Sequence, residues 1–546
     1  MHERRSVLAP GGMVVAPHAL ATAAGLEILQ QGGNAVEAAI AAATTIAVVY
    51  PHMNAIGGDN FWLIYEASTG KVHALSACGQ AGRQCTIEAY RAAGYSQELP
   101  RRGPLAALTV PGAPDGWAEA HAFSREHLDG QRSLADLLAR AIGYAANGFP
   151  VTPGQEAWTR RNVGPESGPF GQLERFKGFR RAFLRDDGTP YDAGELMRLP
   201  ELAVTLQVIA DEGRDAFYVG PIAELITLHL CGQGGLLTEE DFAAYRSRWD
   251  APLSVGYRDW TLYNTPPPTQ GLTSLQILKI AERFPFQRWT DGDADYYHVL
   301  IEATKQAFVD RDAWIADPDA VRIPLEELLS ERRAAERASA IDAAMAAPPP
   351  NARAVGGDTV WFGAIDAAGN AVSCIQSTYF DFGSGVIPPG TGVVLQNRGS
   401  SFSLDPRHPN ALAPGKRPFH TLNPAMALRD GRPELIYGTM GGEGQPQTQA
   451  ALATRILDRG MGVQEAIDAP RWLYGRTWGE RHERLLVERR VDPRVLDELR
   501  RRGHDVVLAD AWDDRMGHAQ AIWIDPRTGV RHGGADPRGD GIAAGV

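Results

Sequence analysis

The stretch at residues 356–380 constrains the fold more than any other part of the sequence. Two glycines and Asp358 are followed by a run from Thr359 to Ile365, a turn at residues 366–370 and a second run to about Phe380. Two strand-like runs joined by a Gly-containing turn predict a β-hairpin. We therefore expect sheet structure in the middle of the chain, with Thr359 at the start of a core strand.

Thr359 is the first residue of the predicted strand and directly follows a flexible Gly-Gly-Asp sequence. If the peptide bond between Asp358 and Thr359 were cut, Thr359 would become a new N-terminus. Its hydroxyl would then be a nucleophile and its freed α-amine the base. The alternative is an ordinary β-branched strand residue, and the local sequence leaves both interpretations open.

The composition predicts a globular protein and excludes several classes of partner. The chain has 546 residues, 44% of them hydrophobic, which allows two to four domains or one large layered domain. Its net charge is −12 and no basic run is present, so neither nucleic acid nor a membrane surface is an expected partner. The four cysteines lack metal-ligand spacing. No stretch has the length of a membrane span or a signal peptide, so we expect a cytoplasmic location.

Outside the hairpin, glycines and prolines divide the chain into elements. We expect helices at residues 17–32 and 35–50, strands at 61–65 and 72–76, and a mostly helical part from 115 to about 345. Residues 343–358 are rich in Ala, Pro and Gly, which favours an extended segment with little packing. Further strands are expected at 392–398, 435–439 and 518–524.

The strand expected at 435–439 ends in a glycine pair, Gly441 and Gly442. This pair could be a tight turn, or its backbone N–H groups could form an oxyanion hole. Other common enzyme signatures are missing: the sequence has no G-x-S-x-G, no H-E-x-x-H and no Walker A motif. A processed threonine enzyme is therefore still possible.

Several motifs in order along nearly the whole chain resemble the γ-glutamyltransferase family of N-terminal-nucleophile (Ntn) hydrolases. They lie at residues 11–16, 32–39, 57–61, 148–151, 266–271 and 533–538. The resemblance implies an α+β fold, a four-layer αββα sandwich built from both fragments of a self-cleaved proenzyme. The fragments would be 1–358, with a detachable tail at about 343–358, and 359–546. They would form a heterodimer, alone or paired with a second one.

The resemblance also implies roles for the residues noted above. Thr359 matches the family's nucleophile, Ser377 matches the hydroxyl residue that touches the new amine, and Gly441-Gly442 matches the oxyanion hole. An α-amine has a pKa near ~7.7–8.0, so it can accept the hydroxyl proton at cytoplasmic pH. Attack on an amide would give an acyl-threonine ester that water hydrolyses. No metal or organic cofactor is required by this chemistry.

The residues that hold a glutamyl group in typical members are replaced in this sequence. Cys78 stands at the arginine position, although Arg83 could replace it through a loop shift, and Ser401 stands at the aspartate position. Tyr379 replaces an asparagine, and His420-Thr421 replaces a serine pair. A substrate without an α-ammonium group would not need the aspartate. Its carboxylate could bind Arg398, beside Asn397, with His420 as a second donor, unless Arg398 and His420 are structural.

This pattern resembles the oxamate amidohydrolase branch of the family, so we expect release of ammonia from oxamate or a similarly short carboxylated amide. The alternatives are a γ-glutamyl hydrolase or transferase acting on glutathione-like substrates and a glutaryl or cephalosporin-type acylase. Acyl transfer is expected at most as a side activity. An unprocessed homologue that only binds a ligand is the alternative outside enzymes.

Overall fold

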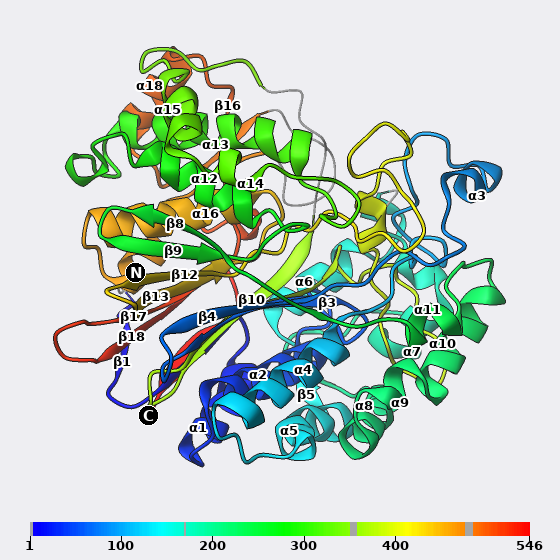
Figure 1. The fold of residues 1–546 in the computed structure, drawn as a ribbon. Coiled ribbons are helices and arrows are strands. Elements are labelled where there is room, and N and C mark those ends of the chain that lie inside the picture. The colour runs from blue at the N-terminus through cyan, green and yellow to red at the C-terminus, as the bar shows by residue number, and fades with distance from the viewer. Residues whose placement is uncertain (1–3, 169–170, 350–356, 476–483) are drawn as a thin grey trace.

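The computed structural model describes residues 4–168, 171–349, 357–475 and 484–546. Two seven-stranded antiparallel sheets lie face to face, with helices on both outer sides (Figure 1). The first sheet contains, in spatial order, β19 (Ile542–Gly545), β2 (Met13–Ala16), β10 (Asp358–Ile365), β11 (Ala371–Tyr379), β3 (Asp59–Glu66), β4 (Lys71–Ala77) and β7 (Arg248–Asp250). The second contains β1 (Val7–Ala9), β18 (Arg531–Ala535), β17 (Ala519–Ile524), β13 (Arg432–Thr439), β12 (Ala425–Arg429), β9 (Trp260–Asn264) and β8 (Leu253–Tyr257).

The predicted hairpin forms the centre of the first sheet. Strands β10 and β11 pair with each other and are flanked by β2 and β3, and every residue of both strands is buried. The pairing register shifts once, between Asp358 and Val360, so the ladder is irregular at Thr359. The hairpin prediction is therefore confirmed, and its first strand lies in the core.

Side-chain alternation along β10 divides the interior into two layers. Trp361 packs between the sheets with Ile375, Met426 and Ile436. Val360 belongs to the core on the opposite face, where helices cover the sheet. This period of two is the expected result for a strand buried on both faces. Packing on both faces of β10 therefore fixes the strand that begins beside Thr359.

Helices cover both outer faces and complete an αββα sandwich (Figure 1). On the first sheet lie α1 (Ala19–Gln30), α2 (Ala35–Val49), α4 (Ala113–His127), α5 (Leu134–Asn147) and α8 (Pro200–Glu212). On the second lie α12 (Gly271–Ala281), α13 (Ala294–Trp314), α15 (Glu331–Ser339), α16 (Gly444–Ala453) and α18 (Pro493–Arg501). All of α2 is buried because its surface consists mainly of alanine and other small residues, and Asn34 caps its start with Glu37.

The remaining elements are short. They are α3 (Ile87–Ala92), α6 (Pro153–Arg161), α7 (Lys177–Phe183), α9 (Asp215–Tyr218), α10 (Pro221–Cys231), α11 (Glu239–Ala243), α14 (Leu325–Leu328), α17 (Val463–Asp468), β5 (Phe149–Pro150), β6 (Leu196–Met197), β14 (Trp472–Tyr474), β15 (Leu485–Glu488) and β16 (Val506–Ala509). Among the described residues, no helix combines the length and the apolar character that crossing a membrane requires.

The part from 115 to about 345 is mostly helical, as expected, and it also contains β8 and β9, which form an edge of the second sheet. One expectation about secondary structure was wrong. Residues 392–398 form no strand: Leu395 makes a single bridge to Gly57, and a 3-10 helix follows at Arg398–Ser401. Of the tail expected at 343–358, residues 350–356 lie outside the described part of the chain.

Candidate active site

Thr359 lies at an irregular point of the sheet, next to the start of a helix. Asp358 pairs with Tyr379 and Val360 pairs with Gln376, so Thr359 alone faces two residues of β11. Such bulges are common beside active sites, where they change the direction of a side chain. Thr359 is 1% exposed, and its Oγ1 lies 3.4 Å from Nε2 of Gln445, in the first turn of α16. The positive end of that helix dipole therefore faces the hydroxyl.

Ser377 contacts the peptide bond that was predicted to be cut. Its hydroxyl donates a short hydrogen bond to the backbone carbonyl oxygen of Asp358 and accepts one from the Tyr379 N–H at 2.8 Å. A donor on this carbonyl oxygen stabilises negative charge there when a nucleophile attacks the carbon. Ser377 is thus placed to assist cleavage between Asp358 and Thr359.

The side chain of Asp358 is buried in a setting that favours its neutral form. Burial raises its pKa well above the ordinary value, and the nearby carboxylate of Asp381 raises it further. Neither carboxyl oxygen has a hydrogen-bond partner among the described residues. Asp381 itself is paired with Arg102 at 3.0 Å. A carboxyl group whose neutral form is favoured therefore lies beside the peptide bond that was predicted to be cut.

The glycine pair after β13 forms the turn that leads into α16. Gly441 and Gly442 have φ angles of 120° and 51°, which only glycine adopts readily at the first position. The turn is held from two sides, by Nε2 of Gln270 donating to the Gly442 carbonyl at 2.8 Å and by an ion pair at 3.0 Å between Arg311 and Glu443. Backbone amides in a fixed turn at a helix start suit an oxyanion hole.

Arg398 is a buried cation stacked against the site. Its side chain is 0% exposed, and its Cζ lies 4.0 Å from the ring centroid of Tyr379. Nη1 donates to Oγ1 of Thr421 at 3.2 Å, whereas Nε and Nη2 meet no acceptor within the described ranges. Burial lowers its pKa to about 10, so the group stays charged near neutral pH. Two unused donors on a buried guanidinium fit one carboxylate.

Asp59 and His420 adjoin this cation. Burial raises the pKa of Asp59 to about 7, although the Arg398 charge and N–H bonds from Gly79 and Gly112 oppose the rise. Burial lowers the pKa of His420 well below its usual value, and the Arg398 charge lowers it further. Nε2 of His420 lies 3.3 Å from Oδ2 of Asp59. Near pH 7 the histidine is neutral and the carboxyl group is about half ionised.

The other sequence-predicted substrate residues have different surroundings. Asn397 braces its loop, because its amide donates to the Arg101 carbonyl at 2.7 Å and its oxygen accepts from the Phe380 N–H at 3.1 Å. Ser401 donates to the Phe419 carbonyl at 3.0 Å. Arg83 is exposed and lines a separate cavity that it shares with Cys78.

A cavity of about 190 Å³ opens beside Tyr379. Its wall includes Arg101, Arg311, Phe380, Ser400 and Ser401. Typical pockets for drug-sized ligands measure ~300–1,000 Å³, so this one suits a small molecule. Arg311, which pairs with Glu443 beside the glycine turn, lines one part of the cavity, and Tyr379, on which Arg398 stacks, lines another.

Three contributors were missed from the sequence. Gln445 contacts Thr359, and Asp59 adjoins the Arg398 cluster. Nε2 of Gln270 donates to both the Thr421 carbonyl, at 2.7 Å, and the Gly442 carbonyl. Asp59 and Gln270 lie inside motifs noted for the resemblance, which was the one available signal. Gln445 follows the glycine pair by a few residues on a helix that was not predicted.

Comparisons with known proteins identify relatives of this chain. A glutathione hydrolase-like YwrD proenzyme of Bacillus subtilis is 46% identical over 542 residues, which cover 99% of this chain and 100% of that protein. An oxamate amidohydrolase proenzyme of Klebsiella pneumoniae is 48% identical over 537 residues, 98% of each chain. The crystal structure of a cephalosporin acylase from Bacillus halodurans superposes with a TM-score of 0.91 at 39% identity, covering 100% of this chain and 98% of that one.

The family described as gamma-glutamyltranspeptidase matches residues 21–546. The two stacked sheets, the helical outer layers and relatives that match over their full length support the same assignment. This chain belongs to the gamma-glutamyltranspeptidase family of Ntn hydrolases and is an enzyme that acts on amides.

Proposed function

We propose that this self-processing amidohydrolase cuts itself between Asp358 and Thr359 and then hydrolyses oxamate, or a similarly short carboxylated amide, through an acyl-threonine ester. Two relatives share comparable identity with the chain but carry different names, so the substrate must be argued from the site. The observation that carries the substrate proposal is the buried Arg398 with two unused donors. It stacks on Tyr379, which lines the small cavity, whereas Arg398 and Thr359 do not line it.

Self-cleavage follows from the contacts around the scissile bond. Oγ1 of Thr359 attacks the Asp358 carbonyl carbon, and Ser377 stabilises charge on the carbonyl oxygen. The acyl group moves from nitrogen to oxygen, and water hydrolyses the resulting ester. The products are a fragment ending at Asp358 and a fragment that begins with a free threonine α-amine, and the two remain together as a heterodimer.

The same hydroxyl then attacks the substrate. The freed α-amine accepts the proton from Oγ1, and the hydroxyl oxygen bonds to the amide carbon. The Gly441-Gly442 turn and the start of α16 stabilise the oxyanion, with Gln445 as a further donor to the hydroxyl. Ammonia leaves with a proton, and water hydrolyses the ester to release oxalate.

A γ-glutamyl substrate is the second candidate. It carries an α-ammonium group, and Glu98 and Asp312 line the cavity as acidic groups. Both are engaged already, Glu98 with Arg101 at 3.2 Å and Asp312 with Arg311 at 2.7 Å. The small cavity and these existing ion pairs favour the shorter substrate.

The test measures ammonia release from oxamate and glutamine by purified two-fragment protein, with γ-glutamyl-p-nitroanilide assayed in parallel. We expect activity on oxamate alone. Release from the γ-glutamyl compounds would overturn the assignment and point to Glu98 or Asp312 as the ammonium partner. Single-chain protein that hydrolyses oxamate would instead refute the processed threonine.

A further inference from the structure

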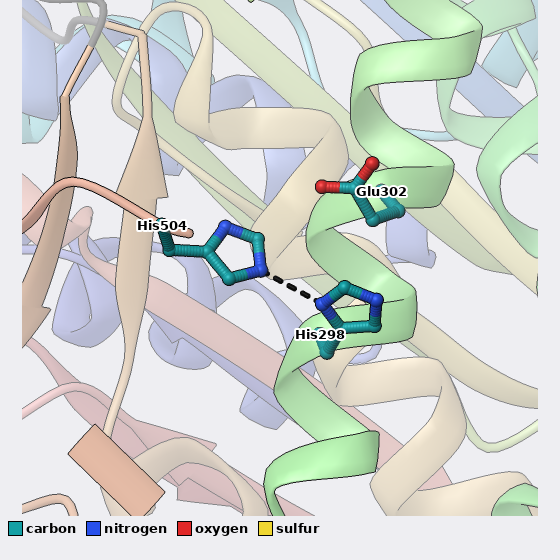
Figure 2. Close-up of side chains that lie close together, drawn as sticks. All are labelled: His298, Glu302 and His504. Atoms are coloured by element: carbon teal, nitrogen blue, oxygen red, sulfur yellow. Dashed lines mark hydrogen bonds between the residues drawn. The ribbon is translucent and has the colours of Figure 1, made fainter. Parts of the chain in front are cut away.

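A buried cluster of His298, Glu302 and His504 shares no residue with the site described above (Figure 2). His298 and Glu302 are one turn apart on α13, and His504 lies between α18 and β16. Figure 2 shows the three side chains converging from these two parts of the chain. One nitrogen or oxygen from each residue lies within 4.8 Å of the other two.

The contacts of His298 fix which of its ring nitrogens faces the cluster as an acceptor. Nε2 lies 2.8 Å from the carbonyl oxygen of Asp342, and a carbonyl can only accept, so Nε2 carries the proton. The lone pair of Nδ1 therefore points toward Nε2 of His504, at 2.8 Å. A metal-bound histidine commonly has this arrangement, in which the second nitrogen donates to a carbonyl.

We propose that His298, Glu302 and His504 bind a divalent transition metal ion, with Zn²⁺ as the expected occupant. Two imidazoles and one carboxylate give three ligands, and water completes a tetrahedron. Zinc–nitrogen bonds of about 2.0–2.1 Å place two tetrahedral ligands roughly 3.3 Å apart. The histidine rings must therefore separate by about half an ångström.

The charges around the cluster select the type of ion. Glu302 already pairs with Nζ of Lys305 at 2.7 Å and accepts the Ala347 N–H at 3.0 Å, and carboxylate oxygens have further lone pairs. Because Lys305 neutralises this carboxylate, the neutral imidazoles supply most of the affinity. Nitrogen ligands favour Zn²⁺ over Mg²⁺ or Ca²⁺.

The ion would join the two fragments of the processed enzyme. His298 and Glu302 precede Thr359 in the chain, whereas His504 follows it. The segment before the cleavage point is held at the same place, because the Ala346 N–H donates to the Arg502 carbonyl at 2.7 Å. Lys305 also donates to the Ala347 carbonyl at 2.8 Å. Bridging rests on the proposed cleavage, but metal binding does not.

Binding is tested on the full chain, made without a histidine tag and stripped with a chelator. We expect one equivalent of Co²⁺ to give the intense visible absorption of a tetrahedral site and one equivalent of Zn²⁺ to displace it. His504→Gln and Glu302→Gln should each weaken binding at least ~10–100-fold. The matched control is His73→Gln, because His73 also lies beside a carboxylate, Glu66 at 3.0 Å, but is outside the cluster.

Two results would overturn the metal site. One is the absence of a tetrahedral Co²⁺ absorption band in wild-type protein. This result does not depend on whether any variant folds. The other is equal affinity in wild type and His504→Gln. Thr359→Ala should bind the metal as wild type does while remaining one chain. Uncleaved wild type that binds zinc would refute the proposed processing alone, and cleaved protein that binds none would refute the metal site alone.

Discussion

The substrate proposal depends most on Arg398, so its replacement by methionine is the sharpest test. Methionine fills similar space but removes the charge and both unused donors. Hydrogen bonds to charged groups contribute about 1.5–3 kcal/mol each, and tenfold in rate corresponds to about 1.4 kcal/mol. Loss of both donors, together about 3–6 kcal/mol, should therefore lower kcat/KM for oxamate by at least about 100-fold. Arg398→Lys keeps the charge but not the forked pair of donors. Its kcat/KM for oxamate should therefore lie between those of wild type and Arg398→Met.

The assay compares oxamate with oxamide, in which a neutral amide replaces the carboxylate. Wild type should prefer oxamate, and Arg398→Met should lose that preference while self-cleavage continues. The matched control is Arg455→Lys, because Arg455 is also 0% exposed but pairs with Asp291 at 2.9 Å. We expect the control to reduce stability and leave the preference intact. If Arg398→Met still prefers oxamate, Arg398 does not bind the carboxylate.

Four further predictions concern the same site. Thr359→Ala should remain a single 59.1 kDa chain without activity, and two bands on a denaturing gel would refute the nucleophile. Ser377→Ala should slow self-cleavage ~10²–10³-fold, as judged by band intensity over time, because it removes the donor to the Asp358 carbonyl. Gly441→Ala should lower kcat by at least ~10-fold, because a φ of 120° is strained for alanine. An unchanged kcat would show that this turn is not the oxyanion hole. Asp59 gains negative charge as pH rises through about 7, so KM for oxamate should increase above that pH. In Asp59→Asn, KM for oxamate should not change with pH over this range. If its KM still rises as in wild type, a group other than Asp59 is responsible for the titration.

The hairpin and the helices near the N-terminus could be predicted because their signals are local. Strand alternation and the Gly-containing turn specify β10 and β11, and the Asn34 cap with its alanine-rich continuation specifies α2. Strands β8 and β9 were missed because they are short and gain their stability from tertiary pairing, β8 with β9 and β9 with β12.

The candidate site was predicted in part. Thr359 and the glycine pair were candidates from the local sequence, and the resemblance added Ser377 and matched all of them to family roles. The hydroxyl of Ser377 donates to the Asp358 carbonyl. Substrate binding by Asn397 stays a prediction, and the structure adds that its amide joins two loops through Arg101 and Phe380. No pattern in a sequence specifies such contacts, because their partners come from distant segments.

Gln270 has a consequence for the length of the acyl group that the enzyme can accept. One side-chain nitrogen donates to the carbonyls of both Thr421 and Gly442, and so links the partner of Arg398 to the turn beside Thr359. If Arg398 binds the substrate carboxylate as proposed, this amide sets the distance from the carboxylate site to the reacting carbon. We then expect a substrate with more methylene groups to fit poorly. A shorter side chain at position 270 should let the enzyme accept longer acids.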